Sequence, residues 1–174
     1  PGIEVAGTIE AIGEGVDNLK VGDKVAALMP IGGYSEKVAV HKAIVQPLPA
    51  GIEAEHATAL MCAYGTSHHA LKQRAHLQSG ETLLVLGAGG ATGLAAVEIG
   101  KAMGAKVVAV ASSDQKLATA KEHGADELVK NDENLATNLK KLAGHKGFDV
   151  VFDPIGGDAF DASIRRMAWN GRYL

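Results

Sequence analysis

The stretch from Leu83 to Gly100, "LLVLGAGGATGLAAVEIG", runs from an apolar segment through four clustered glycines into a second apolar segment. A strand that enters a helix through a glycine-rich turn is typical of the first βαβ unit of a dinucleotide-binding domain. Glycines between a strand and a helix can also simply make a tight, well-packed turn. The surrounding elements therefore decide between the two interpretations.

Two registers of the G-x-G-x-x-G pattern fit these glycines. One uses Gly87 and Gly89 and places Thr92 third, whereas the other uses Ala88, Gly90 and Gly93. We choose the second register because Gly93 then falls in the first helical turn, where the helix must approach the strand closely. The N–H groups at the start of this helix would face phosphate oxygens, aided by the helix dipole.

From Glu81 onward, strand-like and helix-like segments alternate. The predicted strands lie at about 82–87, 106–111, 126–129 and 148–153, and the predicted helices at about 91–103, 114–123, 134–143 and 158–168. Gly104, Gly124 and Gly144 follow helical segments, at positions where a left-handed residue often ends a helix. Hydrophobic residues make up 47% of the chain and aromatic residues 4%, which suits a buried parallel sheet packed from small aliphatic side chains. We predict an α/β fold with a doubly wound Rossmann sheet.

The first part of the chain has a different pattern. Short strand-like stretches, "EVAGTIEAIG", "GDKVAAL" and "GGYSEKVAVH", are separated by glycine-containing turns and predict an antiparallel, barrel-like piece. The prolines and glycine of "QPLPAGIEAEH" mark a boundary, so the expected domains are residues 1–50 and 51–174. Residues 52–73 are predicted to be helical, with a break near Tyr64 and Gly65.

Composition and motifs exclude several classes. The net charge is -3 and no basic block is present, so nucleic acid is not an expected partner. No apolar run reaches the roughly 20 residues that span a bilayer. Cys62 is the only cysteine, which excludes an internal disulfide and favours a cytoplasmic setting. Neither a P-loop nor a Tyr-x-x-x-Lys pair is present.

The end of the second predicted strand bears on the choice of cofactor. An NAD site places an acidic residue near Ala111 or Ser112, but the chain has Ser112 and Ser113 there, followed by Lys116. Two hydroxyls and a cation suit the 2′-phosphate of NADP(H). Alternatively, Ser112 and Gln115 could form a helix capping box, or Ser113 or Asp114 could equally cap the helix. Asp114 could also reach a ribose, which would leave NAD possible.

In combination, these motifs resemble the zinc-independent quinone oxidoreductases, the ζ-crystallin-like group of the medium-chain dehydrogenase/reductase superfamily. "PGIEVAGTIEAIGEGV", "GDKVAAL" and "GGYSEKVAV" are similar to the family's GroES-like domain, and "FDVVFDPIGGD" resembles the strand beneath the nicotinamide. The resemblance covers essentially the whole chain. It implies NADPH as cofactor and hydride transfer to a quinone or another electron-poor alkene, such as an α,β-unsaturated carbonyl, without zinc and without a required side-chain nucleophile.

The resemblance also implies roles for particular residues. The implied contacts are Thr66 near the nicotinamide, Ala88, Gly89, Gly90, Ala91 and Thr92 along the pyrophosphate, Ser112, Ser113 and Lys116 around the 2′-phosphate, and Asp153, Pro154 and Ile155 around the nicotinamide ribose. Asn131 replaces a tyrosine that many relatives carry near the adenine. Tyr64 lies beside the cleft and is a candidate for substrate contact, although it could equally be a packing aromatic at a helix end.

Zinc ligands of the superfamily's alcohol dehydrogenases are replaced or missing. Ile3 stands where those enzymes have histidine, and their four-cysteine loop is absent. Cys62 matches another ligand position but lacks its partner, and Glu4 matches an acidic position that could equally brace the fold. His68 and His69 are neighbours, whereas helical zinc ligands are three or four residues apart. We expect no metal.

Two other functions stay open: an NADPH-binding structural or regulatory protein with little catalysis, as in lens crystallins, and an NAD-dependent alcohol dehydrogenase. The chain begins at Pro1 and ends at "GRYL", where a new strand is expected to start, so we expect a fragment lacking both ends and inactive alone. The resemblance implies a homodimer for the full-length protein.

Overall fold

The computed structural model describes all 174 residues, Pro1 to Leu174, and divides into two compact units. The first unit is Pro1–Cys62 and the second is Ala63–Leu174. None of the helices has the length and hydropathy that a bilayer crossing requires.

The first unit contains a small antiparallel sheet. Its strands β1 (Glu4–Thr8), β2 (Lys24–Leu28) and β3 (Val45–Pro47) pair in the order β1-β2-β3, and the short helix η1 (Lys42–Ile44) precedes β3. Ala26 and Ala27 of β2 are buried.

The strand predicted for "GGYSEKVAVH" is wrong. Gly33 and Tyr34 donate backbone hydrogen bonds to Gly2 and Pro1, but the residues after them form no ladder. Alternating apolar residues form a strand only where a neighbouring strand offers its backbone groups, and none pairs here. The third strand of this sheet is instead β3.

The chain is helical between residues 54 and 74. The helix α1 (Ala54–Ala59) is followed by the π-helical turns η2 (Leu60–Tyr64), the helix α2 (Gly65–His68) and the π-helical turns η3 (His69–Arg74). The predicted break near Tyr64 and Gly65 is wrong, because Tyr64 keeps helical backbone angles of φ −73° and ψ −37°. The wider π-helical turns allow the backbone to continue without interruption.

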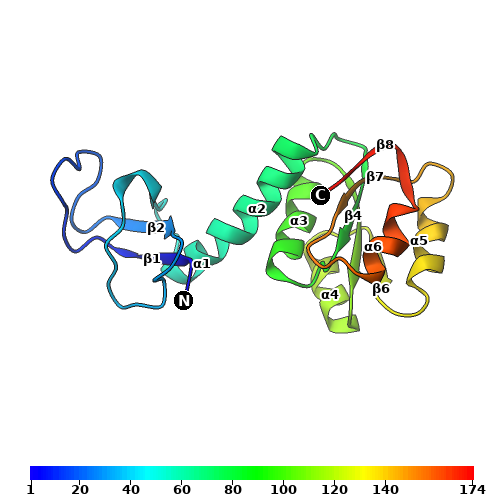
Figure 1. Cartoon of the computed structure of the whole chain (residues 1–174), viewed down its shortest axis with the longest axis horizontal. Helices are drawn as coiled ribbons and strands as arrows, with labels where there is room; N and C mark the ends of the chain where they lie inside the picture. Colours follow the sequence, from blue (N-terminus) through cyan, green and yellow to red (C-terminus); the bar gives the residue numbers. More distant parts are fainter. The chain divides into compact units, whose positions relative to one another are not determined.

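The second unit is a five-stranded sheet with helices on both faces (Figure 1). Its strands are β4 (Thr82–Leu86), β5 (Lys106–Ala111), β6 (Glu127–Lys130), β7 (Phe148–Phe152) and β8 (Met167–Tyr173). They are all parallel and lie in the order β6-β5-β4-β7-β8. The chain first builds outward from β4 to β6 and then resumes on the other side of β4 with β7. The carboxyl ends of β4 and β7 therefore flank the crevice where ligands bind in such sheets.

Helices cover both faces of this sheet, with one apolar core cluster on each face. The helices are α3 (Ala91–Ala102) and α4 (Asp114–Glu122) on one face, and α5 (Leu135–Ala143) and α6 (Asp158–Ile164) on the other (Figure 1). One core cluster includes Leu71, Leu83 and Val97, and the other includes Leu84 and Leu139. Alternate residues of β4 serve opposite faces, which is why the strand is apolar throughout.

The predicted helix 158–168 is too long. The helix α6 ends at Ile164, and the chain enters β8 at Met167 after Arg166 donates its N–H to Ser163 O. Met167 and Tyr173 pack partly against the second core cluster, so burial against the sheet outweighs continued helix. The other predicted helices and strands of this unit agree with the structure to within one residue at each end.

An ion pair ties the segment before β4 to the strand β8. Arg172 donates from Nη1 and Nη2 to the two carboxylate oxygens of Glu81, at 2.9 and 2.6 Å, and from Nε to Ala75 O at 2.9 Å. The hydrogen bonds from Arg172 lower the pKa of Glu81, although burial opposes this shift. Bidentate pairs of this kind are stronger than ordinary hydrogen bonds.

Glu81→Gln is expected to reduce the free energy of unfolding at neutral pH by about 1.5–3 kcal/mol, because a charged hydrogen-bond partner of Arg172 is lost. A lowered pKa stabilises the folded state above the ordinary value of 4.5, and this contribution is lost as the pH falls through the lowered pKa. The difference from wild type should therefore shrink in acid. Urea unfolding at neutral and acidic pH measures it, with the exposed Glu133→Gln as control. Equal stability of Glu81→Gln and wild type at neutral pH would contradict the expectation.

Candidate functional site

The glycine turn after β4 has a defined geometry. Gly87 adopts φ +67°, a conformation that side chains disfavour, and its carbonyl accepts the N–H of Gly90 at 3.0 Å. Ala88 is fully buried and donates its N–H to Val110 O at the end of the neighbouring strand β5. The turn is therefore held between the two central strands, and Gly87 is the glycine that its backbone requires.

Gly93 lies where α3 meets this turn. A Cβ at Gly93 would overlap the carbonyl group of Gly87 and lie 2.9 Å from Ala88 Cα. Gly93 thus has the close helix–strand packing on which the choice of register was based. Gly90 is the N-cap residue of α3 and provides no side-chain cap. The N–H groups of Ala91 and Thr92 are left for a ligand, as at helix N-termini that bind phosphate.

Lys116 connects the turn with the end of β5. Its stem covers Gly89 so closely that a Cβ there would lie 2.5 Å from Lys116 Cβ. Its ammonium Nζ lies 3.5 Å from Ser112 Oγ. Ser112 and Lys116 are both exposed. The structure therefore places a hydroxyl and a cation together beside the glycine turn.

The neighbours of this pair bear on two alternatives from the sequence. Ser113, not Ser112, is the N-cap of α4, and its hydroxyl accepts the N–H of Lys116 at 3.3 Å, so the Ser112–Gln115 capping box does not form. Asp114 pairs instead with Lys130 of β6, with 3.1 Å between carboxylate and ammonium.

Asn131 follows β6 beside this cluster. It is exposed, and its N–H donates to Ala111 O at the end of β5 at 2.9 Å. The structure therefore brings Asn131 to the same sheet edge as Ser112 and Lys116.

The segment after β7 lies against the glycine turn. Asp153 Oδ1 accepts the N–H groups of Ile155 and Gly156 at 2.9 and 2.7 Å. Ile155 Cγ2 would lie 2.9 Å from a Cβ at Gly87, and Pro154 Cγ would lie 3.6 Å from it. Pro154 and Ile155 are exposed. The predicted residues Asp153, Pro154 and Ile155 thus sit at the crevice beside β4.

Thr66 lies on α2, which a buried serine fastens to α3. Ser67 is fully buried and donates its hydroxyl to Thr92 O at 2.7 Å. Thr92 belongs to the first turn of α3, so this bond keeps the exposed Thr66 near the start of that helix. All of these predicted residues lie in the second unit. They come from the glycine turn, the ends of β5 and β7, and α2.

Tyr64 takes part in a polar cluster. Its hydroxyl donates to one oxygen of Glu98 on α3, and His123 Nδ1 contacts the other. The hydrogen bond to Glu98, with burial, raises the pKa of Tyr64 to about 12. Burial alone would raise the pKa of Glu98, but the hydrogen bonds from Tyr64 and His123 outweigh it, so the net pKa is lowered. His123 is the C-cap residue of α4, just before Gly124.

Glu98→Gln is expected to bring the pKa of Tyr64 back from about 12 toward its ordinary value of 10, since the negative acceptor of its proton is removed. The near-ultraviolet absorbance of tyrosinate, followed against pH, measures the change. Subtracting the curve of Glu98→Gln/Tyr64→Phe isolates Tyr64 from the other tyrosines, and Glu122→Gln is the control for a lost surface charge. Identical titration curves for wild type and Glu98→Gln would refute the effect.

No group of three or more His, Cys, Asp or Glu side chains is arranged to hold a metal ion. Glu4 Oε1 accepts the N–H of Cys62 at 2.9 Å, so its carboxylate braces the first unit. Cys62 is half-buried. His68 and His69 are exposed, and His69 contacts Gln73.

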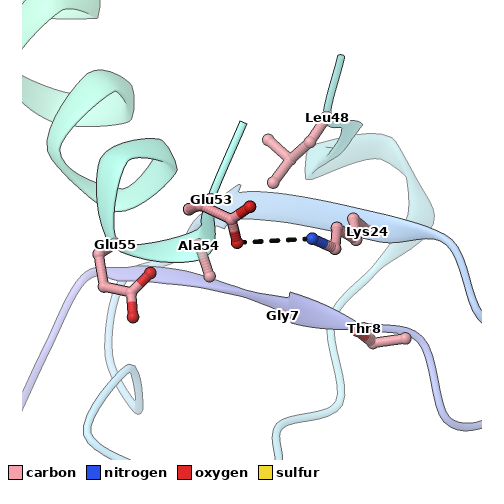
Figure 2. Close-up of a pocket in the computed structure, with 7 residues that line it drawn as sticks. All are labelled: Gly7, Thr8, Lys24, Leu48, Glu53, Ala54 and Glu55. Carbon is pink, nitrogen blue, oxygen red and sulfur yellow. Dashed lines mark ion pairs between the residues drawn. The ribbon is translucent and has the colours of Figure 1, made fainter. Parts of the chain in front are cut away.

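The first unit has two hollows. The smaller, of about 200 Å³, is shown in Figure 2, where Lys24 points toward Glu53 at 3.6 Å. The larger, of about 610 Å³, is lined by β1, β2 and residues 35–45. Neither contains a residue predicted to bind cofactor or substrate.

Several residues that build the site were missed by sequence reasoning. Lys130 and Ser67 have ordinary sequence surroundings, and their partners are 16 and 25 residues away. Glu98 and Tyr173 are likewise defined only by contacts with residues distant in the sequence, Tyr64 and Asp153. No local motif marks these positions.

The two units match two family models in order. Residues 1–50 match the alcohol dehydrogenase GroES-like domain, and residues 91–174 match the zinc-binding dehydrogenase model. A GroES-like domain followed by a Rossmann-like parallel sheet defines a two-domain dehydrogenase architecture.

Among proteins with this architecture, the chain is similar to quinone oxidoreductases and to an enoyl reductase. Quinone oxidoreductase-like protein 2 of Rattus norvegicus is 36% identical over 176 residues, covering 100% of this chain and 50% of that protein. The quinone oxidoreductase of Thermus thermophilus, solved also in complex with NADPH, is 36% identical with a TM-score of 0.84, covering 99% of this chain and 53% of that one. The CurK enoyl reductase is 30% identical with a TM-score of 0.91, covering 99% and 52%.

The chain belongs to the medium-chain dehydrogenase/reductase superfamily, with quinone oxidoreductase-like relatives. The resemblance found in the sequence is confirmed at this level, as is the predicted fold class. The chain spans about half the length of the relatives that it matches.

Proposed function

We propose that this chain carries the NADPH site of an oxidoreductase that transfers a hydride to a quinone or to another electron-poor alkene, such as an α,β-unsaturated carbonyl. One observation carries the proposal: three ligand-ready features converge at the carboxyl ends of β4, β5 and β7. These are the uncapped first turn of α3, the Lys116–Ser112 pair, and the turn at Pro154 and Ile155.

Each feature suits one part of NADPH. The N–H groups of Ala91 and Thr92 would hold the pyrophosphate, since helix N-termini favour anions. Ser112 and Lys116 would hold the 2′-phosphate, because a cation and a hydroxyl give charge-assisted hydrogen bonds. The Ser113 hydroxyl accepts the N–H of Lys116 in the helix cap, and its own proton is still available to donate to a phosphate oxygen. Asn131 would lie on the adenine side.

The remaining predicted contacts concern the reactive end. The segment Asp153–Ile155 would flank the nicotinamide ribose and Thr66 the nicotinamide. When bound, NADPH supplies the hydride, and the acceptor takes its proton from solvent. The protein's own part is to orient donor and acceptor, which lowers the barrier without a side-chain nucleophile. Tyr64 stays a proposed substrate contact, now with its hydroxyl proton held by Glu98.

The preference for NADPH over NADH has a second support. Asp114 is the one acidic residue near the β5 end that could bind a ribose 2′-OH, and it pairs with Lys130. The NADPH complex of the Thermus thermophilus quinone oxidoreductase supports the same choice, and the CurK enoyl reductase supports an alkene acceptor.

We also propose that the reaction needs no zinc. Ile3 has no group that can bind a metal, and Glu4 is engaged by the backbone of Cys62. Zinc analysis of the purified protein tests this point, and about one equivalent of tightly bound zinc would refute it.

Acceptor-dependent oxidation of NADPH by the purified full-length protein tests the function. We expect loss of NADPH absorbance with a quinone or an enone, and a much slower reaction with NADH. Tight NADPH binding without turnover over a broad panel of acceptors would instead favour a binding protein, and no NADPH binding would overturn the proposal.

Three further assignments belong to this proposal. The matched GroES-like model ends at residue 50, which supports a domain division at 50/51. A cytoplasmic location and a homodimer are the settings that the family resemblance implies. Light scattering during gel filtration measures the oligomeric state.

A further inference from the structure

Asp153 directs both of its carboxylate oxygens into its own chain. Oδ1 accepts the N–H groups of Ile155 and Gly156, and Oδ2 accepts the hydroxyl of Tyr173 at 2.8 Å. A carboxylate whose oxygens are both engaged in this way is suited to fix the turn that follows it. Gly156 and Gly157 come next, with φ +64° and +63°, conformations that glycine adopts at little steric cost.

Tyr173 is itself held in place. Its ring meets Phe160 edge-on, with 5.0 Å between the ring centres and 67° between the planes. Its hydroxyl is 3.0 Å from the hydroxyl of Ser163, which is fully buried. An ionised carboxylate can only accept, so the single Tyr173 proton goes to Asp153, while the Ser163 hydroxyl donates to Phe160 O at 3.0 Å. Burial raises the pKa of Tyr173, and the bond to Asp153 acts in the same direction.

The Pro154–Ile155 turn, which Asp153 holds in this way, forms one wall of the crevice at the ends of β4 and β7. Ile155 packs on the bare face of Gly87, where even a Cβ would come within 2.9 Å. Gly87 in turn begins the glycine turn that leads into α3. A shift of Ile155 would therefore open the contact between the β7 end and the proposed phosphate-binding turn.

We propose that Tyr173 is a positioning residue for the cofactor, which through Asp153 holds the Pro154–Ile155 turn against Gly87. This inference rests on the proposed function, since it names a further residue of the same site. Tyr173 lies on β8, on the far side of β7 from β4, and does not itself line the glycine turn. Its effect is exerted entirely through the Asp153 carboxylate.

Tyr173→Phe tests the inference, because it keeps the ring and its contact with Phe160 and removes only the hydroxyl. We expect amide hydrogen exchange at Ile155 and Gly156 to accelerate about tenfold, and the Kd for NADPH to rise about tenfold, as for one lost hydrogen bond to a charged group. The Kd for NADH should rise by the same factor, since the turn is remote from Lys116. Tyr34→Phe, at an 83% exposed tyrosine, is the matched control and should change none of these values.

The outcomes separate the inference from the proposed function. Unchanged exchange at Ile155 and Gly156 overturns the clamp, and faster exchange with an unchanged Kd for NADPH overturns its role in cofactor binding. If the wild-type protein binds no NADPH, the proposed function fails together with that role, while the exchange data still show whether Tyr173 holds the turn. A merely structural role would lower the stability to urea without a local change in exchange, and this result also overturns the inference.

Discussion

Gly93→Ala is expected to lower the free energy of unfolding by about 1–3 kcal/mol, as overpacking in a tight interior does. The new Cβ would overlap the Gly87 carbonyl and lie 2.9 Å from Ala88 Cα. These are backbone atoms of a turn held by Val110, so they cannot rotate away as a side chain can. In a helix, alanine is ordinarily about 1 kcal/mol more favourable than glycine. A net loss would therefore report the close packing directly.

Gly65→Ala is the matched control for this substitution. Gly65 is also helical, but nothing lies within 4 Å of a Cβ there, so the protein should be unchanged or slightly stabilised. Urea unfolding followed by circular dichroism compares the two variants. Gly93→Ala should also weaken NADPH binding, because the turn must move. If Gly93→Ala were as stable as Gly65→Ala, the packing of α3 against the turn described above would be wrong.

Lys116→Ala is expected to raise the Kd for NADPH about 10- to 100-fold and to leave the Kd for NADH nearly unchanged. The ammonium beside Ser112 would be lost, and a hydrogen bond between charged groups contributes about 1.5–3 kcal/mol. NADH lacks the 2′-phosphate, so it has no such bond to lose. Fluorescence titration with both nucleotides measures the two constants.

Lys140→Ala on α5 removes the same charge from the other face of the sheet and is the control for a general electrostatic effect. It should change neither constant by more than about twofold, since exposed charges are largely screened at moderate salt. Equal weakening of NADPH and NADH by Lys116→Ala would place the lysine elsewhere on the nucleotide. If Lys140→Ala also lost the preference for NADPH over NADH, the preference would depend on the net charge of the protein and not on a defined pocket.

The parts of the fold that were predicted correctly depend on local rules. The strand before Gly87 and the helix after Gly90 follow from apolar segments joined by a turn that only small residues allow. Gly104 and Gly124 end their helices with φ +83° and +105°, as their positions suggested. Such features are decided within a few residues of chain.

The errors and omissions depend on distant partners. The residues after Gly33 alternate like a strand but find no neighbour, whereas the chain from Met167 becomes a strand because β7 lies beside it. The partner of Asp114 proved to be Lys130, on the next strand. The hydroxyl of Tyr173 reaches Asp153 only once β8 has paired with β7. Sequence reasoning could name the chemistry of the site but not the side chains that hold it in shape.

The strand order has a consequence for how the site is acquired during folding. The glycine turn follows β4, while Ile155 follows β7, and Leu83 pairs with Val150 only after two intervening strand–helix units have been traversed. Closing so long a loop costs entropy before any contact repays it, so pairings of this kind form slowly. We therefore expect the half of the nucleotide crevice that follows β4 to form before the half that follows β7. Nucleotide added during refolding should bind only after β7 has paired with β4. The rate of nucleotide binding should therefore report the rate of this pairing.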